Sequence, residues 1–168
     1  QEGLIMPYVI TNPILGTQPI ANTETVQKHP LGLIVSGVDP VYGGGEFIYL
    51  SGVASTVLGS WVTYNPDDFS TTLLAANAIG PVGVAMSINV ASQYGWYQIS
   101  GKAIGKALVS FADNANVYGT ATAGSVDDAV VAGDRVQCCK GASAVDTPSA
   151  GLAEFEIARP FVNDALAD

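Results

Sequence analysis

The segment Ser92–Ala103, SQYGWYQISGKA, gathers three aromatic side chains around one glycine, and its pattern occurs earlier in the chain. Its part Gly95–Ala103 (GWYQISGKA) and the segment Glu46–Ala54 (EFIYLSGVA) share the order aromatic, two residues, Leu or Ile, Ser, Gly, one residue, Ala. Aromatic and β-branched residues favour strands, and glycine within a strand pattern marks a bend. We therefore expect two similar strands, each ending in a bend at Ser-Gly, in hairpins that pack together.

From residue 31 onward the chain consists of short β-branched and aromatic runs separated by turn sequences. The runs are LGLIVSGV, EFIYLSGVA, GSWVTY, PVGVAMSINV, GWYQISG, KALVSF, VYGTAT, DRVQCC and LAEFEIARPFV, and the turns include DPVYGGG, NPDD, DNAN and VAGD. Many short runs of this kind are typical of an all-β domain. Residues 31–168 are therefore predicted to form one β-rich domain, either a β-barrel or a β-sandwich.

Helix is expected in two short places only. SVDDAVVAG (residues 125–133) has the pattern of one turn capped by Ser125, and NDALAD (residues 163–168) begins with the capping residue Asn163. Both segments are too short to form a stable helix alone.

Residues 1–30 are predicted to form an extended arm, because four prolines interrupt them and each removes a backbone donor. Short apolar pairs lie between these prolines, and such pairs are unfavourable on a merely solvated arm. We expect the arm to dock on a neighbouring surface. The expected contact residues are Tyr8, Val9, Ile10, Ile14, Leu15 and Ile20.

The charge balance and the apolar runs exclude several classes of partner. Six Lys and Arg against fifteen Asp and Glu give a net charge of −9, which would repel the phosphates of nucleic acid. No apolar run approaches the roughly 18 residues of a membrane-spanning helix. The start of the sequence has no basic segment or cleavage pattern typical of a signal peptide. We expect neither a nucleic-acid partner nor a membrane partner.

The sequence does not predict catalytic, cofactor-binding or metal-binding residues. The single histidine, His29, lies in the arm, and no Gly-x-Ser-x-Gly motif is present, so a histidine-based triad is not expected. SGKAIGKA resembles a phosphate loop, but Ser100 and Ala107 occupy positions that require glycine and a hydroxyl residue. Lys102 and Lys106 are expected to be solvated strand charges that pair with carboxylates.

The acidic residues and the two cysteines are predicted to have structural roles. Asp67, Asp68, Asp113, Asp127, Asp128 and Asp134 lie in turn sequences, where aspartate caps backbone amides. A calcium site is an alternative that the sequence does not exclude. A carboxylate-based hydrolase is another alternative, and it would require two of these acids in one cleft. Cys138 and Cys139 are adjacent, which prevents both from binding one metal on a strand, and we expect both to be buried apolar residues.

The aromatic residues Tyr94, Trp96 and Tyr97 have two interpretations. Strand alternation sends Tyr94, Trp96 and Gln98 to one face, and Tyr97 and Ile99 to the other. Packing in a core or between subunits is the favoured interpretation. A sugar-binding platform is the alternative, although convergent polar groups are not concentrated nearby.

Five segments together resemble a known class of protein: DPVYGGGEFIYLSGVAS, GSWVTYNPDD, GPVGVAMSINVASQYGWYQISGKA, VAGDRV and FEIARPFVNDA. They are similar to the small capsid decoration proteins, or cement proteins, of tailed bacteriophages. The resemblance covers about residues 31–163 and does not include the arm.

The resemblance implies a structural, non-enzymatic virion protein that is made in the host cytoplasm and binds the major capsid protein on the outer capsid surface. It also implies self-association, often as a homotrimer, and stabilisation of the capsid against internal pressure. The arm is not part of the resemblance, and we expect it (residues 1–30) to dock on the shell or on a neighbouring subunit. The alternatives are a head-tail or tail component, a carbohydrate-binding β-sandwich, and the hydrolase named above.

Overall fold

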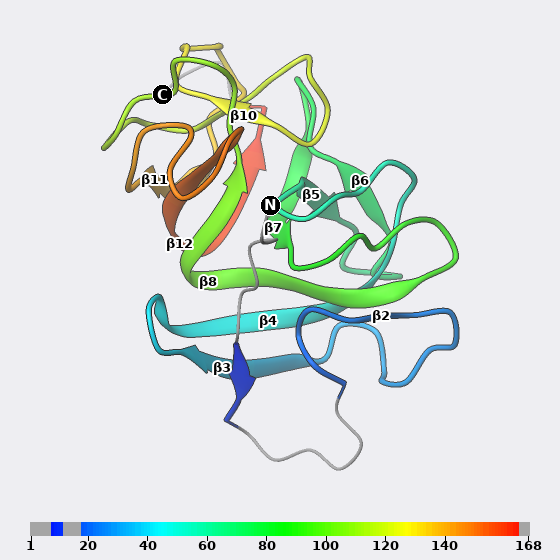
Figure 1. The fold of residues 1–168 in the computed structure, drawn as a ribbon. Helices are drawn as coiled ribbons and strands as arrows, with labels where there is room; N and C mark the ends of the chain where they lie inside the picture. Colours follow the sequence, from blue (N-terminus) through cyan, green and yellow to red (C-terminus); the bar gives the residue numbers. More distant parts are fainter. Residues whose placement is uncertain (1–7, 12–17, 165–168) are drawn as a thin grey trace.

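The computed structural model describes residues 8–11 and 18–164, and these residues contain strands, turns and bends but no helix. Figure 1 shows the strands in chain order. The predicted all-β class is confirmed. The strands are β1 (Val9–Ile10), β2 (Thr23–Glu24), β3 (Ile34–Asp39), β4 (Gly43–Ser51), β5 (Trp61–Tyr64), β6 (Thr71–Leu73), β7 (Ile79–Ala85), β8 (Tyr94–Lys106), β9 (Tyr118–Gly119), β10 (Val126–Asp127), β11 (Gln137–Gly141) and β12 (Leu152–Asn163).

Ten of these strands form one antiparallel sheet, in the order β1-β3-β4-β8-β12-β7-β5-β6, with β11 added to β12 and β2 added to β8. The remaining strands, β9 and β10, pair with each other. The long strand β8 is central, because it pairs with β4, β12, β7 and β2. In Figure 1 its first part runs beside β4, and its second part bends away to run beside β12.

The two segments with the shared sequence pattern lie side by side as β4 and β8. Their aromatic residues face each other in register, with Tyr49 opposite Trp96 and Ile48 opposite Tyr97. Strand β4 ends at Ser51 as expected, whereas β8 bends at Gly101 and continues to Lys106. Gly101 has a φ of 99°, and a side chain there would overlap the carbonyl oxygen of Gly44. The Ser-Gly bend of β8 is therefore a kink within a strand and not its end.

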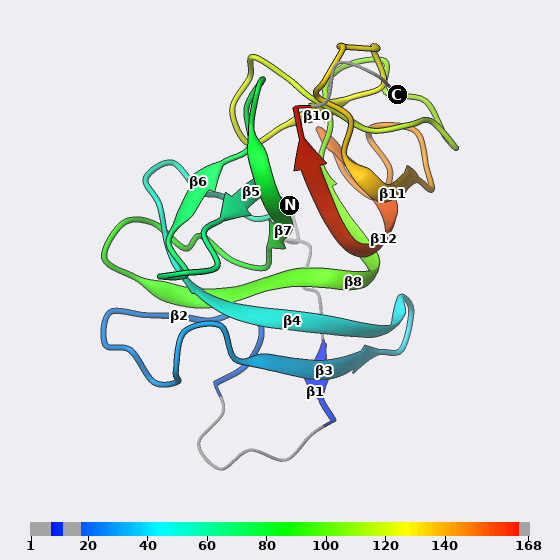
Figure 2. The ribbon, with the colours of Figure 1, turned by 180° about the vertical axis from the view of Figure 1, so that it is seen from behind.

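Strand β12 changes partners at Arg159. Residues 152–158 pair with β8, whereas residues 161–163 pair with β7. Arg159 has a φ of 50°, a left-handed conformation that redirects the strand. Because β7 also pairs with β8 through Val84 and Ala85, the strands β7, β8 and β12 meet at a three-way junction. The sheet thereby curls into a half-barrel, which Figure 2 shows from behind.

Apolar side chains are buried on both faces of the β4–β8 ladder. The arm-side cluster lies on one face and the hairpin-side cluster, which packs under β5 and β7, lies on the other. The arm-side cluster is Tyr8, Ile20, Val35, Phe47, Tyr49, Met86, Trp96 and Ile104. The hairpin-side cluster is Ile48, Leu50, Val62, Ala85, Tyr97 and Ile99. Each large apolar side chain buried in this way contributes roughly 1.5–3 kcal/mol.

A third cluster, the junction cluster, joins the strands around β12. It brings Trp61 of β5 against Phe155 of β12, with the ring centroids 4.8 Å apart and the rings nearly perpendicular. Phe111 packs on the same phenylalanine at 5.2 Å. Edge-to-face and tilted contacts of this kind are favourable arrangements of aromatic rings. The junction is therefore held by side-chain packing as well as by backbone hydrogen bonds.

The described residues of the arm belong to the same sheet and core as the rest of the chain. Strand β1 pairs with β3, and β2 pairs with β8. Tyr8 and Ile20 are buried in the arm-side cluster. The described residues of the arm include the short strands β1 and β2, and they lie on the arm's own domain.

The helix expected at residues 125–133 does not form. Val126 is fully buried in the junction cluster, and β10 pairs with β9 through Val126 and Asp127. The Ser125 carbonyl accepts a hydrogen bond from the Thr120 hydroxyl at 3.0 Å. These long-range contacts outweigh the local capping pattern. Of the second expected helix, Asn163 ends β12, and residues 165–168 lie outside the described part.

Candidate functional site

The aromatic stretch is divided between the two faces of the sheet, as strand alternation predicts. Trp96 packs in the arm-side cluster and Tyr97 in the hairpin-side cluster, and both are 0% exposed. Tyr94 is half-buried, and its ring stacks on Tyr49 with a centroid separation of 6.4 Å. Since two of the three rings are covered, these residues do not form an open platform for a sugar.

His29 packs against the aromatic residues of the arm-side cluster. Its ring lies 5.2 Å from Tyr49 and 5.7 Å from Trp96, measured between centroids. The histidine is buried within its own chain. Its carbonyl oxygen accepts a hydrogen bond from the Gln27 side-chain amide at 2.8 Å. This arrangement anchors the end of the arm on the sheet.

Four of the six aspartates predicted to cap backbone amides do so, namely Asp68, Asp127, Asp128 and Asp134. Asp68 accepts hydrogen bonds from the backbone amide and hydroxyl of Ser70, which lower the pKa of its carboxyl group. Asp128 accepts from the backbone amide of Ala112, and Asp134 from that of Asn77. Within residues 8–11 and 18–164, no three His, Cys, Asp or Glu side chains gather as a metal site would require.

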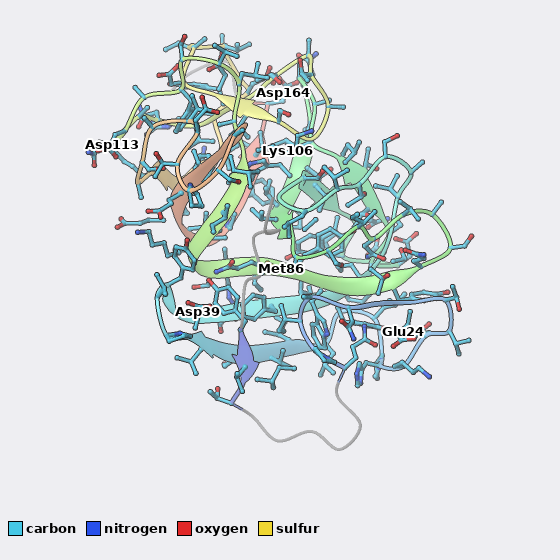
Figure 3. The ribbon with its side chains drawn as sticks, in the orientation of Figure 1. Glu24, Asp39, Met86, Lys106, Asp113 and Asp164 are labelled. Carbon is cyan, nitrogen blue, oxygen red and sulfur yellow. The ribbon has the colours of Figure 1, made fainter. Side chains whose placement is uncertain are left out.

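Figure 3 shows how widely four labelled acids are separated. Glu24 and Asp39 lie in the part of the molecule formed by β2, β3 and β4, whereas Asp113 and Asp164 lie beyond the far end of β8. A carboxylate-based hydrolase needs two acids within about 5–10 Å across one cleft. Acids from these two parts of the molecule therefore do not meet in one cleft.

Lys102 is a strand charge with a carboxylate partner, as expected. Its amino group forms an ion pair with Glu154 on the neighbouring strand β12, and it lies 5.8 Å from the centre of the Tyr42 ring. The backbone carbonyl of Lys102 accepts hydrogen bonds from the hydroxyl of Tyr8 at 2.8 Å and from the side-chain amide of Gln98 at 3.2 Å. This residue therefore links the arm, β8 and β12.

The two cysteines differ from the expectation that both are buried. Cys138 is exposed and has a φ of 55°, and it lies at a bulge in the β11–β12 ladder whose extra residues belong to β12. Cys139 is partly covered and packs against the junction cluster, and this burial raises the pKa of its thiol. The two thiols are free, and the bulge gives them different surroundings.

The residues predicted to contact a neighbour occupy different positions. Tyr8 and Ile20 are buried in their own chain, so in this conformation they do not offer a surface to another molecule. Ile10 is half-buried against the arm-side cluster, and Val9 is 63% exposed. Ile14 and Leu15 lie outside the described residues. Among the described arm residues on that list, Val9 is the one most open to contact.

Val9 lies at the edge of a hollow that we call the open sheet face. It lies beside β3 and β4 and has a volume of about 360 Å³. Val9 is paired opposite Val38, and Val38 is paired opposite Gly44. The open sheet face consists of Val9, which pairs with Val38, and of the residues that line the hollow: Thr11, Ser36, Gly37, Val38, Gly44, Gly45, Glu46 and Ser100.

An ion pair bounds the open sheet face at one end. Glu46 accepts two hydrogen bonds from the guanidinium group of Arg159, at 3.2 and 3.3 Å. This pairing raises the pKa of Arg159, and it joins β4 to the kink of β12. Sequence reasoning missed both this pair and the open position of Gly44, because the three consecutive glycines 43–45 indicated only a turn.

Two other hollows are also open to solvent. One, of about 380 Å³, lies next to β2 and contains Met86, which Figure 3 labels, and the exposed Ile88. The other, of about 260 Å³, lies beside the β5–β6 turn and contains Tyr64 and Ile79. Neither contains a charged side chain, so neither resembles a catalytic cleft.

Comparisons with known proteins do not place the chain in a family. It matches no protein-family model, no curated protein and no solved structure. Among the described residues, no helix is long and apolar enough to cross a membrane.

Proposed function

We propose that this chain is a structural virion protein that binds the outer face of a bacteriophage capsid and stabilises it, without enzymatic activity. The observation that carries the proposal is that the side chains most suited to chemistry or ligand binding have structural roles within the chain itself. The histidine and both tryptophans pack inside the chain, and carboxylates cap turns. Apolar residues such as Val9 and Val38 remain on the outside of a rigid sheet.

A rigid antiparallel sheet with exposed apolar residues suits a protein that acts by contact. Contact surfaces of this kind need shape and apolar area, and they do not need titratable groups. The sequence resemblance to decoration proteins supports the same role. The net charge of −9 is compatible with it, because an acidic exterior protein does not capture nucleic acid without specificity.

The proposed partners are the major capsid protein and further copies of the chain. The resemblance implies a homotrimer on the outer capsid surface. The described part of the arm lies on its own domain, so the contacts with the shell are assigned to exposed residues of the sheet domain and to arm residues outside the described part.

Electron microscopy of capsids mixed with the purified protein tests the proposal. We expect added density on the outer capsid face and a decrease in capsid disruption by heat or chelator. Density confined to the tail would indicate the tail-component alternative, and a ring at one vertex would indicate a head-tail component. A protein that does not bind capsids, before or after their expansion, would contradict the proposal.

A further inference from the structure

We propose that two copies of this chain pair face to face through the open sheet face, with valines of each copy lying over Gly44 of the other. This pairing goes beyond the proposed function, differs from the homotrimer that the resemblance implies, and does not require capsid binding. It rests on three features: an unexplained glycine, a self-complementary shape, and a local absence of unpaired charge.

Gly44 is the unexplained glycine. Its φ lies outside the left-handed region, and among the described residues no atom lies within 4 Å of the position that its Cβ would occupy. By contrast, a side chain at Gly101 would overlap backbone, and the Cβ of a residue at position 45 would lie 3.0 Å from the carbonyl oxygen of Ser100. Glycine weakens a strand, and within strands it often marks a site that another backbone approaches closely. The described fold does not itself require glycine at position 44.

The shape of the open sheet face is self-complementary. Val9 and Val38 form a ridge across β1 and β3, and the bare backbone at Gly44 forms a trough directly beside Val38. In a two-fold interface, residue i of one copy contacts residue j of the other, and the reverse contact also forms. A ridge next to a trough meets this condition, because each ridge can enter the trough of the opposite copy. This is the argument for a second copy as the occupant.

Charge also favours this face for self-association. Two copies with a net charge of −9 each repel one another over most approaches. Glu46 is the one charged residue that lines the open sheet face, and it is paired with Arg159. The polar residues Thr11, Ser36 and Ser100 supply a rim for hydrogen bonds, as interfaces commonly have. Two copies can therefore approach here without bringing unpaired carboxylates together.

Sedimentation equilibrium of the purified chain tests the pairing. We expect a monomer–dimer equilibrium, which Gly44→Val weakens about tenfold or more by filling the trough, as expected for a residue at an interface centre. Val38→Lys is expected to weaken it similarly, because it places a charge in the apolar ridge. Val130→Lys is the matched control: this valine is 77% exposed and lies outside the open sheet face, so dimerisation should not change.

The thermal unfolding of Gly44→Val, measured at dilution where the wild type is monomeric, separates an interface role from a structural one. The pairing predicts an unchanged or raised unfolding temperature, because valine favours strands. If Gly44→Val destabilises the monomer, another segment of the same chain lies over Gly44. That result would overturn the pairing. A wild type that is monomeric at all concentrations, or trimeric, would overturn it as well.

Capsid binding distinguishes failure of this inference from failure of the proposed function. A chain that dimerises as described but does not bind capsids would leave the pairing intact and contradict the decoration role. A chain that stays monomeric but binds capsids would contradict the pairing and leave the decoration role intact.

Discussion

The indole of Trp96 shows how single residues serve the framework of this protein. It is fully buried between Tyr49, at a centroid distance of 5.0 Å, and His29, at 5.7 Å. One residue therefore joins β4, β8 and the end of the arm. The aromatic character that first suggests a ligand platform is used to close the core.

Substitution of Trp96 tests this role. Trp96→Ala should lower the free energy of unfolding by about 3–5 kcal/mol, because it leaves a large cavity in the arm-side cluster. Tyr94→Ala should cost less, because Tyr94 is only half-buried. Urea unfolding followed by circular dichroism measures both. Equal stabilities of Trp96→Ala and the wild type would indicate that the indole is a surface group.

Tyr8 should make the protein sensitive to alkaline pH. Burial raises the pKa of its hydroxyl from 10.0 to about 12. A pKa that is higher in the folded state contributes stability that is complete below pH 10 and is lost as the pH rises through about 12. Stability should therefore decrease between these values, and Tyr8→Phe should decrease less steeply. Other buried tyrosines, such as Tyr97, retain their own effect in both proteins, so identical slopes would contradict the role of Tyr8.

The cysteines should react at different rates with an alkylating reagent. Cys138 is exposed at the bulge, whereas burial raises the pKa of the Cys139 thiol and depletes its reactive thiolate. At neutral pH we expect mass spectrometry to find one modification on the folded chain and two on the unfolded chain. Cys138→Ser should remove the fast modification. Fast labelling at Cys139 in that variant would show that the bulge is absent.

At the scale of elements, the kink of β8 depends on Gly101. Gly101→Ala should destabilise the protein by about 1–3 kcal/mol, because it puts a side chain at a φ of 99° and against the Gly44 carbonyl. Gly44→Ala is the matched control on the neighbouring strand, and it should not destabilise the monomer. Thermal unfolding of the two variants at high dilution compares them. Equal losses in both variants would contradict the distinction between the two glycines.

Local sequence patterns predicted a strand well where the strand depends on the preferences of its own residues. The shared motif in β4 and β8 predicted their similarity and their packing, because aromatic and β-branched residues favour strands wherever they pair. The same motif could not show that β8 continues past Gly101, since the second half of β8 pairs with β12, which is distant in the sequence. For the same reason, the burial of Val126 in the junction cluster was not visible in the capping pattern of residues 125–133.

The candidate site was less predictable than the fold. The apolar character of Val9 was visible in the sequence, but its exposure depends on which face of β1 is covered. Its neighbour Tyr8 faces the core, because adjacent residues of an extended chain point to opposite faces. The open position of Gly44 depends on which distant segments lie near it in space, which no local pattern records. The sequence therefore predicted an apolar contact surface, but it did not predict where on the sheet that surface lies.

At the scale of the whole molecule, charge should control self-association. Each copy carries a net charge of −9, so repulsion between copies opposes the proposed pairing at low ionic strength. Added salt shortens the screening length from about 30 Å at 0.01 M to about 10 Å at 0.1 M. Dimerisation, measured by sedimentation, should therefore strengthen as salt is added. Weakening by salt would indicate that attraction between opposite charges holds the copies together.

The three-way junction also bears on how the chain folds during synthesis. Trp61 of β5 packs against Phe155 of β12, so the ribosome must make all the residues between them before this contact can form. At translation rates of about 5–20 residues per second, Trp61 waits on the order of ten seconds for its partner. Folds dominated by such distant pairings form slowly and expose apolar surface in the meantime. The nascent chain should therefore depend on chaperones until β12 has emerged.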